Sequence, residues 1–83
     1  VNMSQEEGQE IYNAEVNRLA IEFGWPLPIV AGRRSHADFH VAKGLSLRWN
    51  YCPNEVATVL LHGSDKAAER GIDYVLRTVN AAI

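Results

Sequence analysis

The central stretch of the chain, residues 37–61, reads ADFHVAKGLSLRWNYCPNEVATVLL. Apolar and polar side chains alternate along residues 37–42 and again along 45–51, which is the period of a β-strand with one buried face. Lys43-Gly44 between these runs is typical of a two-residue hairpin turn, because glycine accepts a positive φ. After a second, proline-containing turn, the apolar run Val56–Leu61 predicts a third strand. We therefore expect three antiparallel strands in the middle of the chain.

Helical periodicity flanks this central stretch on both sides. A capping pattern begins at Ser4, and apolar residues at three-and-four spacing continue to Phe23, before Gly24 ends the helix. A second helix is predicted from the N-cap Ser64 to about Asn80. The expected fold class is α+β, with the order α-β-β-β-α and both helices packed on one face of a three-stranded antiparallel sheet.

The side chains expected to fill the core lie on the second predicted strand. Trp49 and Tyr51 share one strand face with Leu45 and Leu47, so this face is predicted to pack against the two helices. Their aromatic rings are therefore assigned to the core, and not to an exposed surface for stacking bases.

The length and composition indicate one small globular domain over residues 1–83. The chain has 47% hydrophobic and 22% charged residues, which is ordinary for a folded soluble protein. It contains no apolar run of about 18 residues that could span a membrane, and no secretory signal is recognisable. Its single cysteine, Cys52, excludes an intramolecular disulfide. We expect a cytoplasmic protein without membrane contact.

Two segments carry motifs of a known family. Residues 17–28, NRLAIEFGWPLP, contain a leucine-alanine pair, a glycine and a proline-leucine-proline group at the end of the first helix. Ser64, Lys66 and Ala68 begin the second helix. Together these segments resemble the double-stranded-RNA-binding domain, which implies the α-β-β-β-α order and RNA binding. Of the several lysines that this family places at the start of its second helix, the chain keeps only Lys66.

The charge distribution limits where RNA could bind. The chain has a net charge of −2 and a pI near 5.9, whereas a nucleic-acid binder normally has a basic stripe and a high pI. Residues 32–48 nevertheless hold four basic residues and one acid, a balance of +3. Binding of double-stranded RNA through a local basic patch is therefore the alternative function. The candidate residues are Arg33, Arg34, His36, Lys43 and Lys66.

The residues suited to catalysis or metal binding are not arranged for either chemistry. His36 and His40 on one strand would lie about 13 Å apart, too far to share an ion. Cys52 precedes Pro53 in the predicted turn, without a helix N-terminus or a cation to activate its thiol. The glycines are scattered and form no phosphate-binding loop. We expect no catalytic, metal or cofactor site, and hence a protein that is not an enzyme.

The third predicted strand suggests how the chain works. It is apolar on both faces and forms an unprotected edge in a simple meander, so either a partner covers it, which we expect, or a central place in the sheet or a chain terminus buries it. The candidate interface residues are Val56, Ala57, Val59 and Leu61. The sequence therefore predicts a non-catalytic interaction domain that acts through protein contacts, either with another protein or with itself as a homodimer or a higher even oligomer. A third possibility is small-ligand binding or catalysis at a dimer interface.

Overall fold

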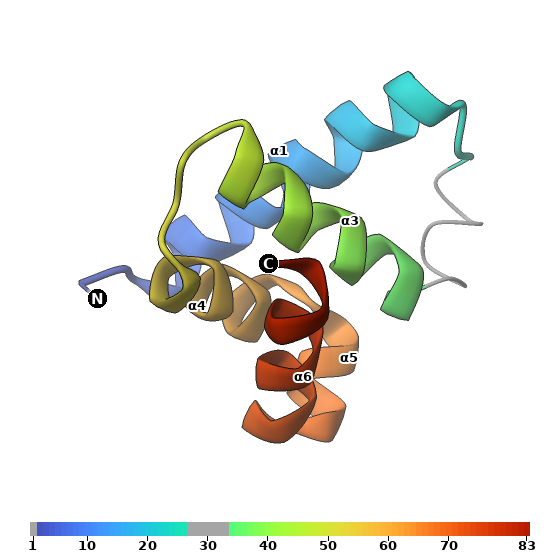
Figure 1. The fold of residues 1–83 in the computed structure, drawn as a ribbon. Coiled ribbons are helices and arrows are strands. Elements are labelled where there is room, and N and C mark those ends of the chain that lie inside the picture. The colour runs from blue at the N-terminus through green and yellow to red at the C-terminus, as the bar shows by residue number, and fades with distance from the viewer. Residues whose placement is uncertain (1, 27–33) are drawn as a thin grey trace.

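The computed structural model describes residues 2–26 and 34–83, and the described residues fold into a small bundle of helices (Figure 1). The bounds of the helices are α1 Gln5–Phe23, α3 Arg34–Leu47, α4 Pro53–Gly63, α5 Asp65–Arg70 and α6 Ile72–Ala82. The short α5 follows α4 directly, and α6 then returns so that the C-terminus lies beside α4 (Figure 1).

The predicted three-stranded sheet is wrong, because the described residues contain no strand. Residues 37–47 lie in α3, and the run Val56–Leu61 lies in α4. Ala37, Val41 and Leu45 are spaced by four, so a helix places all three on one side, and α3 buries each of them almost completely. The α+β class, and the sheet that the resemblance to the double-stranded-RNA-binding domain implied, are corrected to an all-helical fold.

The predicted turn at residues 52–55 is the beginning of α4. Pro53 occupies the first helical turn, where its missing N–H costs nothing. The backbone N–H of Cys52 donates to the carboxylate of the exposed Glu55 at 3.0 Å, and this bond holds the pKa of Glu55 below its usual value. Beyond this cap, Val56, Val59 and Leu60 recur at three-and-four spacing and are buried. The apolar run on which the third strand was predicted therefore supplies the core face of a helix.

The helix predicted at the N-terminal end is confirmed. Ser4 caps α1, because its Oγ accepts a hydrogen bond from the backbone N–H of Glu7 at 3.1 Å. Gly24 ends the helix in a left-handed conformation, with φ of 70°. Ser64 is likewise an N-cap, as predicted, but the helix after it is interrupted at Gly71, whose φ of 81° favours glycine. The single helix expected over residues 64–80 is thus divided into α5 and α6.

One hydrophobic core lies among these helices. Its buried apolar residues are Val16, Leu19, Ala20, Ala37, Val41, Ala42, Leu45, Val56, Val59, Leu60, Ala67, Val75 and Val79. α1 can approach α4 closely because Gly63 has no side chain: a Cβ at Gly63 would lie 2.2 Å from Cβ of Tyr12. Trp49, which the sequence assigned to the core, is 57% exposed. The prediction that Trp49 and Leu47 fill the core is therefore wrong.

A buried carboxylate connects the helices across this core. Asp38 of α3 is fully buried; its Oδ1 accepts a hydrogen bond from the Tyr12 hydroxyl of α1 at 2.5 Å. Its Oδ2 accepts from Ser64 Oγ at 2.6 Å and from the hydroxyl of Tyr74 on α6. Ser64 Oγ also accepts from the backbone N–H of Ala67, which caps α5. We call Asp38, Tyr12, Ser64 and Tyr74 the Asp38 network.

Both tyrosines of this network are held in the protonated form. Burial raises the pKa of Tyr12 well above its ordinary value, and the neighbouring Asp38 raises it further. Burial and the hydrogen bond to Asp38 raise the pKa of Tyr74 to about 12. A phenolate beside a buried carboxylate would lose its hydrogen bond and be repelled. The network is therefore intact only while both hydroxyls keep their protons.

This arrangement predicts that alkaline pH destabilises the protein. An unfolded tyrosine ionises near pH 10, whereas Tyr12 and Tyr74 ionise at higher pH in the folded chain. The stabilisation is fully present below about pH 10 and decreases as the pH rises through the folded pKa values. Urea unfolding between pH 8 and 12 should show this decrease, and the Tyr12→Phe/Tyr74→Phe variant should show a smaller one. Tyr51→Phe is the matched control, and a pH-independent unfolding free energy in the wild type would contradict the prediction.

Candidate functional site

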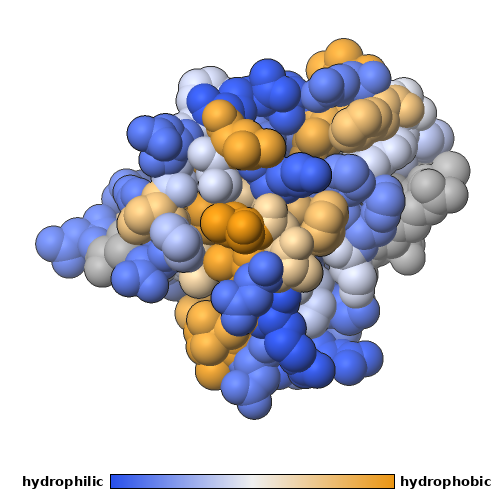
Figure 2. Space-filling view, viewed as in Figure 1, coloured by the Kyte–Doolittle hydropathy of each residue, from blue (hydrophilic) through white to orange (hydrophobic). Residues whose placement is uncertain are grey.

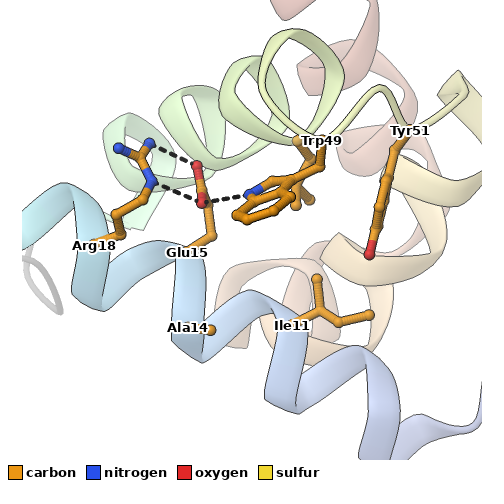
Figure 3. A pocket seen from close by; sticks show the side chains of 7 residues that line it. Ile11, Ala14, Glu15, Arg18, Trp49 and Tyr51 are labelled. Atoms are coloured by element: carbon orange, nitrogen blue, oxygen red, sulfur yellow. Dashed lines mark hydrogen bonds and ion pairs between the residues drawn. The ribbon is translucent and has the colours of Figure 1, made fainter.

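A small pocket lies between α1 and the connection that follows α3 (Figure 3). Its volume is about 240 Å³, and it is lined by Ile11, Ala14, Glu15, Arg18, Leu45, Trp49 and Tyr51. Ile11 points up from α1, the Tyr51 ring reaches down toward it from the connection, and the Trp49 ring extends toward Glu15 (Figure 3). We call this cavity the Trp49 pocket.

The turn after α3 brings both aromatic rings to α1. The backbone N–H of Arg48 still donates to the carbonyl of Gly44 at 2.8 Å, and that of Tyr51 reaches back to Leu45 at 3.1 Å. Between them Asn50 adopts a positive φ of 58°, a conformation that asparagine tolerates better than most residues. Trp49 and Tyr51 are therefore fixed on the same side of the connection (Figure 3).

An ion pair between the buried Glu15 and the partly exposed Arg18 forms one wall of the pocket. Glu15 is 3% exposed, and its Oε1 and Oε2 accept hydrogen bonds from Nε and Nη2 of Arg18 at 3.0 and 2.8 Å. The indole N–H of Trp49 donates to Oε1 at 3.2 Å. Gly44 leaves room for the carboxylate, because a Cβ at this position would lie 2.1 Å from Oε2. The hydrogen bonds from Arg18 to Glu15 and to the exposed Glu22 raise the pKa of Arg18, and Glu15 accepts three hydrogen bonds in all.

The chemistry of the Trp49 pocket is that of an apolar binding site. Its carboxylate is committed to Arg18 and Trp49, so the remaining surface consists of Ile11, Ala14, Leu45 and the two rings. Pockets for drug-sized ligands have volumes of about 300–1,000 Å³, and this pocket is smaller. Its size suits one apolar side chain. An exposed tryptophan beside such a pocket is the kind of residue that dominates protein–protein binding.

The four predicted interface residues are not gathered on one surface. Val56 and Val59 are fully buried in the core. Ala57 is half-buried, and Leu61 is 40% exposed. In the folded chain, only Ala57 and Leu61 of this group are accessible to a partner.

The predicted RNA-binding residues are also dispersed. Arg33 and the side chain of Arg34 lie outside the described residues. Lys43 lies 5.9 Å from the centroid of the Phe39 ring, whereas Lys66 Nζ donates a hydrogen bond to Ser35 Oγ. His36 belongs to the ring cluster described next. Ser35, the partner of Lys66, and Lys43 are eight residues apart on α3, about 12 Å along its axis, and Lys43 and Lys66 line different pockets of the described structure.

Helical spacing brings together two histidines that the sequence reading had kept apart. The ring centroids of His36 and His40 are 4.6 Å apart, and both rings lie against Trp25, at 5.4 and 5.6 Å. Burial lowers the pKa of His40, as do His36 and Lys43. Phe23 stacks on Trp25 at 5.2 Å. Among the described residues no group of three or more His, Cys, Asp or Glu is placed to hold a metal ion.

The Trp49 pocket was missed because Trp49 was assigned to the core of a sheet. One signal was visible: Glu15 lies four residues after Ile11 and four before Leu19, so it falls on the buried face of α1. A carboxylate at such a position needs partners. Arg18 is such a partner at i+3 spacing on α1, whereas the contact with Trp49 depends on the turn after α3.

Comparisons with known proteins give no match: no family model, curated protein or solved structure is significantly similar to this chain. Among the described helices, none combines the length and the apolar character needed to cross a membrane.

The ion pair between Glu15 and Arg18 predicts how single and double substitutions change the free energy of unfolding. Arg18→Met leaves the buried Glu15 carboxylate with only Trp49 as a donor and should lower the free energy of unfolding by about 1.5–3 kcal/mol. Glu15→Gln added to Arg18→Met should restore much of this loss, because the neutral amide needs no counter-ion. Urea denaturation measures both variants.

Arg48→Met is the matched control. Its guanidinium is about half exposed and lies 3.9 Å from Glu22, so its loss should cost less than about 1 kcal/mol. Failure of Glu15→Gln to restore stability would show that Arg18 acts through packing and not through charge.

Proposed function

We propose that the protein is a non-catalytic interaction domain that acts through protein contacts and associates with a second copy of itself through the Trp49 pocket. The observation that carries this proposal is the pairing of two features on α1. The pocket has room for one apolar side chain, and Ile21, the most exposed large apolar residue described, is 84% exposed. An isoleucine so exposed gains by burial in a partner.

The spacing of these features is self-complementary. Ile21 follows Ala14 by seven residues, which is about two helical turns and 10 Å, so both lie on one flank of α1. If two copies of α1 pack antiparallel about a two-fold axis between Asn17 and Arg18, Ile21 of each copy lies opposite Ala14 of the other. Ala14 is the smallest residue in the pocket lining, and it leaves space for the incoming side chain.

The charges along α1 favour the antiparallel arrangement. The first turns of α1 carry Glu6, Glu7 and Glu10. Antiparallel packing places these acidic ends far apart, whereas parallel packing would bring them together and cost energy. At the centre of the antiparallel pair, Arg18 faces the uncharged Asn17, so no like charges oppose each other there. This two-fold contact is isologous and therefore closes at a dimer.

The buried surface supports a weak dimer. Burying one exposed isoleucine contributes about 1.5–3 kcal/mol, and each dimer buries two. Additional cover over Trp49 and Tyr51 offsets part of the cost of association. The two isoleucines contribute about 3–6 kcal/mol in all, and association has its own cost. We therefore expect weak binding, with a dissociation constant of about 0.1–1 mM, which corresponds to about −5.5 to −4 kcal/mol.

The test compares two exposed isoleucines on different surfaces. Apolar surface also lies over α6 (Figure 2), where Ile72 is 51% exposed. Sedimentation velocity from 10 μM to 1 mM should show the wild type changing from a 9.2 kDa monomer to a dimer. Ile21→Lys should remain monomeric with an unchanged melting temperature, because Ile21 lies outside the core.

Ile72→Lys is the matched control and should dimerise as the wild type does. The proposal is overturned if the wild type remains monomeric at 1 mM. It is also overturned if Ile21→Lys dimerises normally while Ile72→Lys does not, because α6 would then form the interface.

A further inference from the structure

A second groove, separate from the Trp49 pocket, lies where α3, α5 and α6 meet. Its volume is about 360 Å³. The cationic side chains that line it are Lys66 and Arg70 of α5 and Arg77 of α6, and Ser35 and Phe39 of α3 lie opposite them. Lys66 and Arg70 are four residues apart and therefore share one face of α5. We call this the basic groove.

The three cations are not neutralised by the described acids. Lys66 Nζ donates to Ser35 Oγ, and Arg77 Nε donates to the backbone carbonyl of Asp73 at 3.4 Å. In the described part of the chain, none of the three forms an ion pair with a carboxylate. The acids of α5 and α6 do not line the groove. Because like charges repel at short range, gathering three cations here is unfavourable until an anion binds among them.

The hydroxyl groups in the groove are already engaged in hydrogen bonds within the protein. Tyr74 donates its proton to Asp38 and Thr78 donates to the backbone carbonyl of Tyr74, so neither O–H is available to a ligand. Ser35 Oγ accepts from Lys66, and its hydroxyl is also hydrogen-bonded to Tyr74, so it is not a free donor either. The donors available in the groove are therefore Lys66, Arg70 and Arg77.

We propose that the basic groove binds the phosphate group of a small phosphate monoester. Guanidinium groups match phosphate oxygens in a bidentate manner, and an ammonium adds a point charge. Phe39 and Ala81, which also line the groove, provide apolar contact for the organic part of the ligand. The volume lies in the range for small-molecule sites. A duplex binder that makes about 6–10 phosphate contacts spreads its cations along a surface, whereas this groove offers three cations.

The experiment titrates the labelled protein with phenyl phosphate, inorganic phosphate and phenol at low salt, followed by amide chemical shifts in NMR. Phenyl phosphate should shift resonances of α3, α5 and α6 and bind more tightly than inorganic phosphate, while phenol should not bind. Arg70→Gln and Arg77→Gln should each weaken binding of phenyl phosphate about tenfold, and Arg77→Lys should weaken it less, because it keeps the charge.

Arg48→Gln removes one exposed cation outside the groove and is the matched control, with unchanged binding. The proposal is overturned if phenyl phosphate causes no shifts at 10 mM, or if Arg48→Gln weakens binding as much as Arg77→Gln. It is also overturned if an RNA duplex binds at far lower concentration through the same residues, because the groove would then be part of a nucleic-acid surface. Ile21→Lys should bind phenyl phosphate normally, which separates this test from that of dimerisation.

Discussion

The buried carboxylate of Asp38 fixes how the helices meet. Removing a charge from water is costly unless the protein replaces the lost hydrogen bonds. Here three hydroxyl groups do so: Tyr12 from α1, Ser64 from the junction of α4 and α5, and Tyr74 from α6. Any shift of one helix relative to α3 would withdraw a donor and leave the carboxylate unsatisfied. The polar network therefore selects one arrangement among the many that apolar packing alone would permit.

The two candidate sites depend on that arrangement. Tyr12 positions α1 against α3 at one point, and Glu15, one turn further along α1, makes a second contact with α3 above Gly44. Together these contacts set the register of α1 and place the pocket wall beneath Trp49. On the other side of α3, Tyr74 draws α6 toward Asp38 and so brings Arg77 near Lys66. The hydrogen bonds to Asp38 thus help to position the helices that form both the Trp49 pocket and the basic groove.

Local signals in the sequence were sufficient for some elements and ambiguous for others. The caps at Ser4, Gly24 and Ser64 act over three or four residues, and each was predicted correctly. The prediction for the middle of the chain was wrong because residues spaced by four, such as Ala37 and Val41, also fit the two-residue alternation of a strand. Asp38 fitted the exposed, polar face of the predicted strand, so nothing in the sequence pattern indicated that Asp38 is buried.

Long-range partners could not be read from the sequence. Tyr12 and Ser64 are each 26 residues from Asp38, and Tyr74 is 36 residues away. Glu15 was the readable exception, since its place among apolar positions of α1 already implied burial. In the basic groove, Lys66, Arg70 and Arg77 would share one face even of a continuous helix over residues 64–80, but the contribution of Ser35 and Phe39 from α3 could not be read.

The most direct test of the role of Asp38 is the unfolding free energy of Asp38→Asn compared with that of Asp65→Asn. The amide keeps the shape of the side chain but removes its charge. It also turns an N–H₂ group toward hydroxyls that, in the wild type, donate hydrogen bonds to the carboxylate. Asp38→Asn should therefore lower the free energy of unfolding by about 2–4 kcal/mol. The exposed Asp65, in the first turn of α5, should cost at most about 1 kcal/mol when replaced. Equal, small effects of both substitutions would contradict the conclusion that Asp38 determines the fold.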